Sequence, residues 1–119
     1  MQKLQFIYNA ETGFFNKLTD FAHKALSPET YACNLCALTH STFTMKQEWA
    51  NYLKRLPLEV EFIYKNEWKF APLHAQYPLI ALQTNNDMQV LIEAAELNSF
   101  TTLKQLEQAL DKTLQIAGY

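Results

Sequence analysis

The clearest structural pattern in the chain is in YPLIALQTNNDMQVLIEAAEL, residues 77–97. It contains two apolar runs, 78–84 and 88–96. Residues 84–87, TNND, separate them and are rich in side chains that tolerate the left-handed backbone geometry of a tight turn. Two such runs around a turn predict a β-hairpin in which 78–84 pairs with 88–96. Pro78 suits the first position of a strand, where its missing N–H costs no ladder hydrogen bond.

A helix is expected after the hairpin and a strand before it. Thr102 and Gln105 have the spacing of a capping box, which marks the start of a helix. The apolar residues that follow recur at helical spacing and are Leu103, Leu106, Leu110 and Leu114. Upstream, residues 58–65 largely alternate between apolar and charged side chains, which is the pattern of a strand with one buried face.

The first half of the chain begins with another strand at 4–9. Helical patterns cover 14–25 and 45–56. Because helical material connects the strands at 4–9 and 58–65, we expect these two strands to pair in parallel. Residues 28–43, between the two helices, show no clean period and contain both cysteines.

This order of elements, with Tyr77-Pro78 before the third strand and a strand–turn–strand–helix ending, resembles the thioredoxin-like superfamily. The resemblance implies one α/β domain over residues 1–119, with a four-stranded mixed sheet and flanking helices. It also implies that the Tyr77-Pro78 bond is cis and that Pro78 faces the functional site. Residues 28–43 would then be an irregular cysteine-containing insertion after the first helix. The chain departs from thioredoxins at residues 9–15, NAETGFF, where their CxxC motif would lie and no cysteine is present.

The composition argues against several classes of function. The chain has 119 residues, a formal net charge of −2 and only two glycines. Acidic and basic residues are interspersed, so no basic stripe is present that would favour nucleic acid, and no glycine-rich loop could hold a phosphate. No apolar run approaches the roughly 18 residues that span a membrane, and the first residues lack the pattern of a signal peptide. We therefore expect a cytoplasmic protein without a nucleic-acid or membrane partner.

The residues with candidate chemistry cluster in CNLCALTH, residues 33–40. Cys33 and Cys36 have CxxC spacing, at which two thiols can close a small disulfide, and in a reducing compartment such a pair is typical of exchangeable thiols. His40 follows Cys36 by one helical turn, and its positive charge would lower the pKa of an attacking thiol. The segment after the first helix is long enough to bring the cysteines back toward Pro78. The first hypothesis is thiol–disulfide exchange or redox sensing with a protein thiol or a small thiol as partner, and with Cys33, Cys36 and His40 as catalytic residues.

Two alternatives stay open for the same residues. The cysteines could be small hydrophobic side chains in a buried segment, because apolar residues surround them. They could also bind zinc together with His40, with His23 as the fourth ligand and His74 as the next candidate. Either alternative would make the chain a non-catalytic binding module. The redox hypothesis itself requires no cofactor, so zinc is the one cofactor considered.

Glu11 is the carboxylate with a candidate role outside the cysteine motif. It follows the first strand, and open α/β sheets bind ligands at the carboxyl ends of their strands. In the first hypothesis it therefore faces the substrate together with Pro78. In the alternative interpretation it is a negative charge near a helix N-terminus that interacts with the helix dipole.

Overall fold

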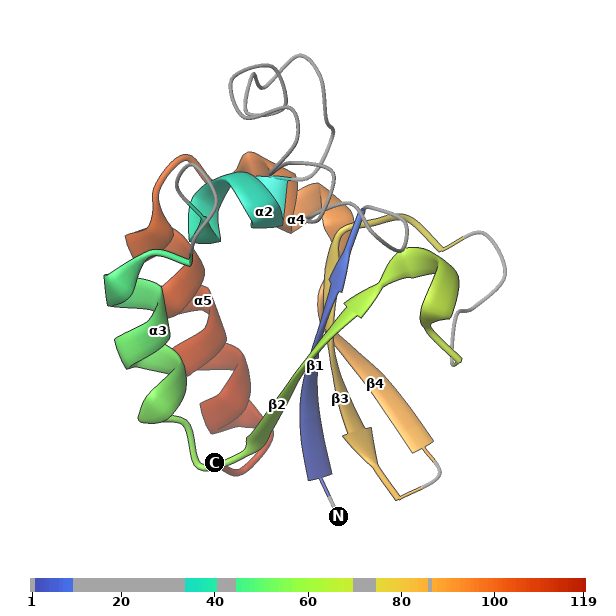
Figure 1. Ribbon diagram of the computed structural model, residues 1–119. Helices are drawn as coiled ribbons and strands as arrows, with labels where there is room; N and C mark the ends of the chain where they lie inside the picture. The colour runs from blue at the N-terminus through green and yellow to red at the C-terminus, as the bar shows by residue number, and fades with distance from the viewer. Residues whose placement is uncertain (1, 10–33, 41–44, 70–74, 86) are drawn as a thin grey trace.

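The computed structural model describes residues 2–9, 34–40, 45–69, 75–85 and 87–119. Four strands form one mixed sheet in the order β2-β1-β3-β4 (Figure 1). The strands are β1 (Gln2–Tyr8), β2 (Glu59–Tyr64), β3 (Leu79–Thr84) and β4 (Asp87–Ile92). β1 pairs in parallel with β2 and antiparallel with β3, and β3 pairs antiparallel with β4. The chain is therefore an α/β protein in which β1 and β3 are the inner strands.

The structure confirms the strand pairing expected from the sequence. The strands at 4–9 and 58–65 pair in parallel as β1 and β2, and the hairpin forms from β3 and β4. The Tyr77-Pro78 peptide bond is cis, also as expected. β3 pairs with β1 along its other edge, a contact that the sequence pattern did not specify.

The predicted strand at 88–96 is wrong over its last residues. β4 ends at Ile92, and after Glu93 the chain forms α4 (Ala94–Ser99). Ala94 and Leu97 are the buried residues of α4. Their three-residue spacing is helical, so the apolar residues at this point continue the hydrophobic run but not the strand.

Helices lie along one side of the sheet and beyond one of its ends (Figure 1). α3 (Gln47–Lys54) and α5 (Leu103–Ile116) lie along the side, whereas α2 (Asn34–Thr39) and α4 lie beyond the end at which β1 stops. The helix expected at 45–56 is confirmed with shorter bounds, and α5 begins with the predicted capping box. The helix expected at 14–25 lies outside the described residues. None of the helices in the described ranges has the length and hydrophobicity that a membrane span requires.

Part of the segment that was expected to be irregular is helical. Residues 34–39 form α2, and the backbone N–H of His40 continues the helical bonding by donating to the carbonyl oxygen of Cys36 at 3.0 Å. The expectation was wrong here because six residues span less than two helical turns, which is too few to show a period. Residues 28–33 and 41–43 of that segment are not among those described.

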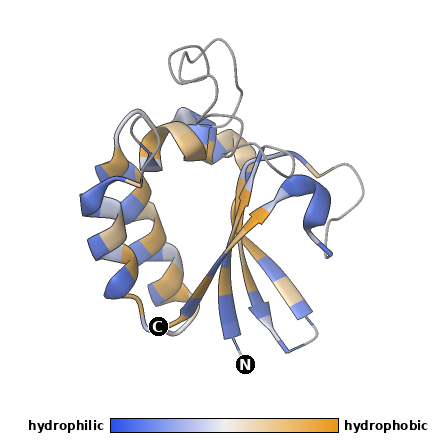
Figure 2. Cartoon of the chain, viewed as in Figure 1, coloured by the Kyte–Doolittle hydropathy of each residue, from blue (hydrophilic) through white to orange (hydrophobic). Residues whose placement is uncertain are grey.

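The main hydrophobic core lies between the sheet and the helices. Alternate residues of β1, Leu4, Phe6 and Tyr8, point into it and are at most 5% exposed. Figure 2 shows apolar and polar residues alternating along the helices and strands that border this core. The Trp49 and Phe6 rings meet edge to face at 5.4 Å between centroids, and the Trp49 ring stacks on Tyr52 of the same helix at 5.5 Å. The Trp49–Phe6 contact therefore joins α3 to β1, an inner strand of the sheet.

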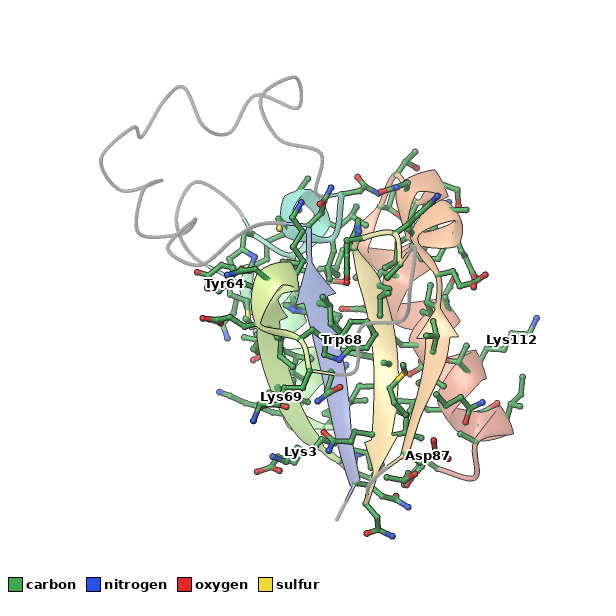
Figure 3. All side chains as sticks on the ribbon, turned by 90° about the vertical axis from the view of Figure 1, so that its right-hand side faces the viewer. Lys3, Tyr64, Trp68, Lys69, Asp87 and Lys112 are labelled. Carbon is green, nitrogen blue, oxygen red and sulfur yellow. The ribbon has the colours of Figure 1, made fainter. Side chains whose placement is uncertain are left out.

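The opposite face of the sheet carries Trp68 over β1 (Figure 3). This residue follows the short 3₁₀ helix η1 (Lys65–Glu67) and packs with Ile7, Leu79 and Ala81. Trp68 is 5% exposed, and its Nε1 donates a hydrogen bond to Gln5 Oε1 at 3.2 Å. One side chain therefore covers the middle of this face and satisfies a buried polar group.

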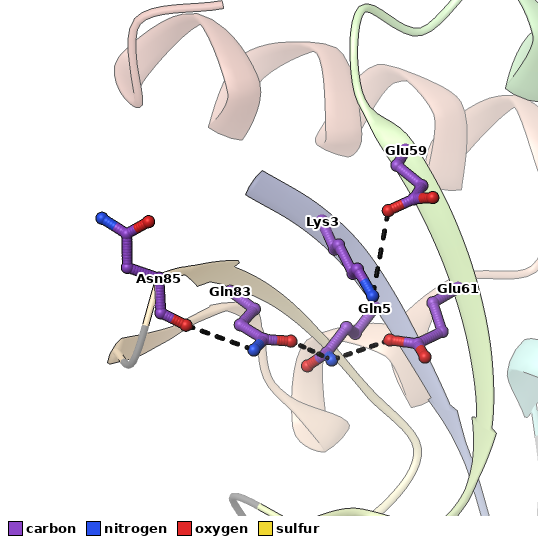
Figure 4. Close-up of polar contacts among 6 residues, drawn as sticks. All are labelled: Lys3, Gln5, Glu59, Glu61, Gln83 and Asn85. Carbon is purple, nitrogen blue, oxygen red and sulfur yellow. Dashed lines mark hydrogen bonds and ion pairs between the residues drawn. The ribbon is translucent and has the colours of Figure 1, made fainter. Parts of the chain in front are cut away.

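A row of hydrogen bonds joins β2, β1 and β3 on the same face (Figure 4). Gln5 is 3% exposed, and its Nε2 donates to Glu61 Oε1 at 3.0 Å and to Gln83 Oε1 at 2.8 Å. With the bond from the Trp68 indole, both amide hydrogens and the amide oxygen of Gln5 have partners. A buried amide is tolerated at this position because all of its polar atoms are satisfied.

Helix α5 carries a buried carboxylate, Glu107, which lies near Glu48 of α3. Glu107 is 7% exposed, and its Oε2 has no hydrogen-bond partner among the described residues. Burial, and secondly the negative charge of Glu48 on α3, raise the pKa of Glu107 above its ordinary value of 4.5, against a smaller opposing effect of Lys104 and Arg55. A carboxyl group whose pKa is raised by folding contributes stability only while it is protonated.

Glu107→Gln should therefore stabilise the fold at neutral pH by on the order of 1 kcal/mol, because the amide removes the buried charge and can donate to Glu48. In the wild type, the contribution of Glu107 is fully present below pH 4.5 and is lost as the pH rises through the raised pKa. The stability difference between variant and wild type should thus grow over that range. Urea unfolding at a series of pH values measures it, with Glu96→Gln on the exposed side of α4 as the control. A difference that stays constant with pH would contradict this account.

Candidate functional site

The cysteine-bearing helix lies beyond the end of the sheet at which β1 stops and β3 begins (Figure 1). β1 ends at Tyr8, and β3 begins with Leu79 opposite Ile7, directly after Pro78. Pro78 is fully buried. Tyr8, α2 and Pro78, which are far apart in the sequence, therefore lie at the same end of the sheet.

Asn34 fixes the start of α2. Its Nδ2 donates to the carbonyl oxygen of Leu97 at 2.7 Å and to that of Phe100 at 2.9 Å. Both acceptors belong to the C-terminal end of α4, where the last carbonyl groups of a helix have no partner within it. One side chain thus uses both of its amide hydrogens to join the beginning of one helix to the end of another.

Cys36 points into the main core. It is 2% exposed and belongs to the cluster that also contains Leu35 and Leu38. Its sulfur is disulfide-bonded. The other cysteine of the chain, Cys33, lies outside the described residues. The burial of Cys36 is compatible with both interpretations of the motif, a redox pair and a core cysteine.

His40 lies where α2 meets the end of β1. Its ring is half-buried, and the edge-to-face contact with the Tyr8 ring has a centroid distance of 6.3 Å. Its Nδ1 is 2.9 Å from the Thr39 hydroxyl oxygen. Burial lowers the pKa of His40 below its ordinary value of 6.5, which favours the neutral ring at pH 7. The environment therefore favours a neutral base at this position rather than the positive charge suggested by the Cys36–His40 spacing.

Tyr8 contributes a second ring to this end of the sheet. Its ring stacks on Phe62 of β2 at 6.0 Å between centroids. Burial, and secondly the neighbouring Tyr64, raise the pKa of Tyr8 above its ordinary value of 10.0. The hydroxyl group therefore stays protonated, and this side of His40 carries no negative charge from Tyr8.

The structure thus shows the positions of some of the predicted site residues. Cys36 and His40 are brought together by α2, and Pro78 lies at the same end of the sheet. Four further candidates, Cys33, Glu11, His23 and His74, lie outside the described residues.

The zinc alternative needs ligands that the described ranges do not contain. Among those ranges, no group of three or more histidine, cysteine, aspartate or glutamate side chains could hold a metal ion. A cysteine sulfur held in a disulfide is also not available as a thiolate ligand, and this applies to Cys36. The geometry that is visible around His40 therefore does not itself build a metal centre.

Sequence reasoning missed Asn34, Thr39 and Tyr8 as parts of this site. Asn34 directly follows Cys33, and asparagine is common at helix starts, so it offered a signal for the beginning of α2. Thr39 next to His40 offered no comparable signal, because its role depends on which way a buried hydroxyl points. Tyr8 is separated from His40 by 31 residues and could be connected to it only through the fold.

A hollow lies on the face of the sheet that Trp68 covers, and no residue of α2 lines it. Its volume is about 390 Å³, and its lining includes Gln5, Trp68, Lys69 and Glu67. The polar atoms of Gln5 are already satisfied by neighbouring side chains. Acidic and basic side chains both line the hollow, so its charge selects no class of ligand.

Comparisons of the chain with protein-family models, with curated proteins and with solved structures gave no match. The assignment of a function therefore depends on the sequence and on the geometry of α2 and its surroundings.

Asn34→Ala should lower the free energy of unfolding by about 1–2 kcal/mol, because two hydrogen bonds to the end of α4 are lost and water can replace them in part. Asn34→Asp should lower the free energy of unfolding further, since a carboxylate has no hydrogen to donate and its oxygens would face the two carbonyl oxygens. Urea unfolding measures both variants. Asn98→Ala, exposed on α4, is the control and should have little effect on stability. An Asn34→Ala variant as stable as Asn98→Ala would show that the two hydrogen bonds do not hold α2.

Proposed function

We propose that this chain is a cytoplasmic thioredoxin-like domain that performs or senses thiol–disulfide exchange through Cys33 and Cys36. The observation that carries the proposal is the position of Cys36, disulfide-bonded and on α2, at the end of the sheet where β1 stops and Pro78 precedes β3. The strand order β2-β1-β3-β4 followed by a C-terminal helix supports the resemblance on which the proposal draws.

The two cysteines have different roles in this proposal. Because Cys36 is buried, it suits an intramolecular second step, and Cys33 is the residue that attacks the partner. The Cys33 thiolate attacks one sulfur of a partner disulfide, whose S–S bond breaks and releases the other sulfur as a thiolate. Cys36 then attacks the Cys33 sulfur, which closes the Cys33–Cys36 disulfide and releases the second partner thiol. The partner disulfide is reduced, and the cysteine pair is oxidised.

A non-catalytic binding module with structural cysteines is the second candidate. The observation in its favour is the burial of Cys36 among apolar side chains, since inert core cysteines have the same surroundings. A zinc site at Cys33, Cys36, His40 and His23 is a variant of this candidate. One zinc ion per chain in protein purified without chelator would favour the variant, whereas well under one would remove it.

Cys36→Ser should trap a mixed disulfide on Cys33 when the reduced, native variant meets an excess of a small aromatic disulfide. Without Cys36, the second step cannot release the bound half of the reagent. Intact-mass spectrometry should show one stable adduct, whereas the wild type should pass through the adduct to a closed disulfide.

Cys33→Ser is the matched control for this experiment. It should form no adduct before unfolding, because the remaining sulfur is buried. Cys36→Ala should behave as Cys36→Ser does, which guards against an effect of a hydroxyl group in the core. If Cys33 of the native protein stays unmodified until global unfolding, the exchange function is wrong and the second candidate is favoured.

A further inference from the structure

Helices α3 and α5 lie side by side and share a line of polar contacts (Figure 1). The Tyr52 hydroxyl oxygen of α3 is 2.7 Å from Asp111 Oδ1 and 3.2 Å from the carbonyl oxygen of Glu107. One helical turn earlier on each helix, the side chain of Glu48 forms a hydrogen bond with the carboxyl group of Glu107. The two side-chain contacts therefore follow one another along the same faces of the helices.

A hydrogen bond between two glutamate side chains requires a hydrogen that two carboxylates do not have. An ionised carboxyl group only accepts hydrogen bonds, so one member of the Glu48–Glu107 pair must be protonated. The raised pKa of Glu107 assigns the hydrogen to this residue. The neutral carboxyl group of Glu107 then donates to Glu48, which is exposed on α3. The pair thus holds one proton and one negative charge.

The surroundings of Glu107 do not compensate for a second negative charge. Its Oε2 is buried and has no hydrogen-bond partner among the described residues. Two cations act on it, Arg55 of α3 and Lys104 of α5, but they lower its pKa by less than burial and the facing carboxylate raise it. The Tyr52 hydroxyl stays protonated because burial raises its pKa, and it contacts Asp111. Ionisation of Glu107 would therefore leave two carboxylates facing each other between the helices.

We propose that Glu48 and Glu107 form a binding site for one proton between α3 and α5, and that loss of this proton at higher pH releases α3 from α5. When the proton leaves, its hydrogen bond is lost and the two like charges repel each other. The cost of burying the new charge disappears only if α3 moves and water reaches Glu107. The inference is independent of the proposed thiol–disulfide exchange, because neither residue belongs to the cysteine-bearing helix.

The lengths of the two helices indicate that α3 is the one that moves. It has 8 residues, whereas α5 has 14 and buries four leucine side chains. A short helix has little stability of its own and depends on the contacts that its buried face makes. Glu48 lies in the first turn of α3, directly before the buried Trp49. Release should therefore begin at the first turn of α3, while the Tyr52–Asp111 contact still holds the next turn.

A titration followed by ¹³C NMR of the glutamate carboxyl groups tests the shared proton. In the wild type, Glu107 should titrate above pH 4.5. Glu48→Gln should lower this midpoint by about one pH unit, because an amide that can donate replaces a negative charge. If burial alone raised the pKa, the midpoint would not change in this variant. Glu96→Gln, which removes an exposed charge from α4, is the matched control and should leave the midpoint unchanged.

Amide hydrogen exchange tests the release of α3. If opening exposes Glu107 to water, the opening equilibrium constant of α3 rises about tenfold per pH unit from pH 4.5 up to the raised pKa, and is constant above it. Exchange rates, corrected for the intrinsic effect of pH, should show this rise in the wild type and in Glu96→Gln. Glu107→Gln should lack the rise, because its amide does not ionise. At each pH the α3 amides should exchange faster than those of β1, since α3 opens without the sheet.

Each outcome supports or overturns a stated part of the inference. An unchanged Glu107 midpoint in Glu48→Gln overturns the shared proton. A lowered midpoint together with α3 exchange that does not depend on pH overturns the release of α3. Equal protection of the α3 and β1 amides overturns it as well, because exchange then requires global unfolding. If Glu48→Gln does not fold, Glu48→Ala removes the same charge and undergoes the same two measurements.

Discussion

The arrangement of the molecule depends on the burial of β1. Residues 4–8 are at most 5% exposed, and they pair with β2 along one edge and, up to Ile7, with β3 along the other. A strand covered on both faces has one usable register, because a shift of one residue would exchange its two sets of side chains. The polar exception is Gln5, whose amide fits only where three side chains from other elements satisfy it. The register of β1 in turn places Tyr8 at the end of the sheet that meets α2.

The sequence predicted those parts of the fold whose causes are local. The hairpin and the capping box of α5 could be identified because turn residues and a Thr102–Gln105 pair act within a few positions. The end of β4 could not, because its apolar run continues into α4 and gives no break between a strand and a helical period. α2 was missed for a different reason. A helix of six residues has little stability of its own, and this one is fixed by Asn34 to carbonyl groups more than 60 residues further along the chain.

For the candidate site, spacing predicted the helical connection between Cys36 and His40 but not the charge state of the imidazole. The four-residue interval between Cys36 and His40 correctly indicated that one helical turn connects them. The charge of the imidazole could not be predicted, because it depends on burial produced by distant elements such as β1. The contact between His40 Nδ1 and the Thr39 hydroxyl could not be predicted either, because the CxxC pattern does not include Thr39.

A buried sulfur and a neutral imidazole suit each other in the proposed chemistry. Burial opposes the ionisation of thiols in general, and it lowers the pKa of the His40 ring, so the surroundings favour uncharged forms at this position. A permanent positive charge beside Cys36 would instead stabilise the thiolate at all times, and a thiolate is the form that oxidants attack. With a neutral imidazole nearby, no such charge favours the thiolate. Such an arrangement suits a residue that closes an internal disulfide, whereas attack on an outside partner requires the exposed and ionised sulfur that the proposal assigns to Cys33.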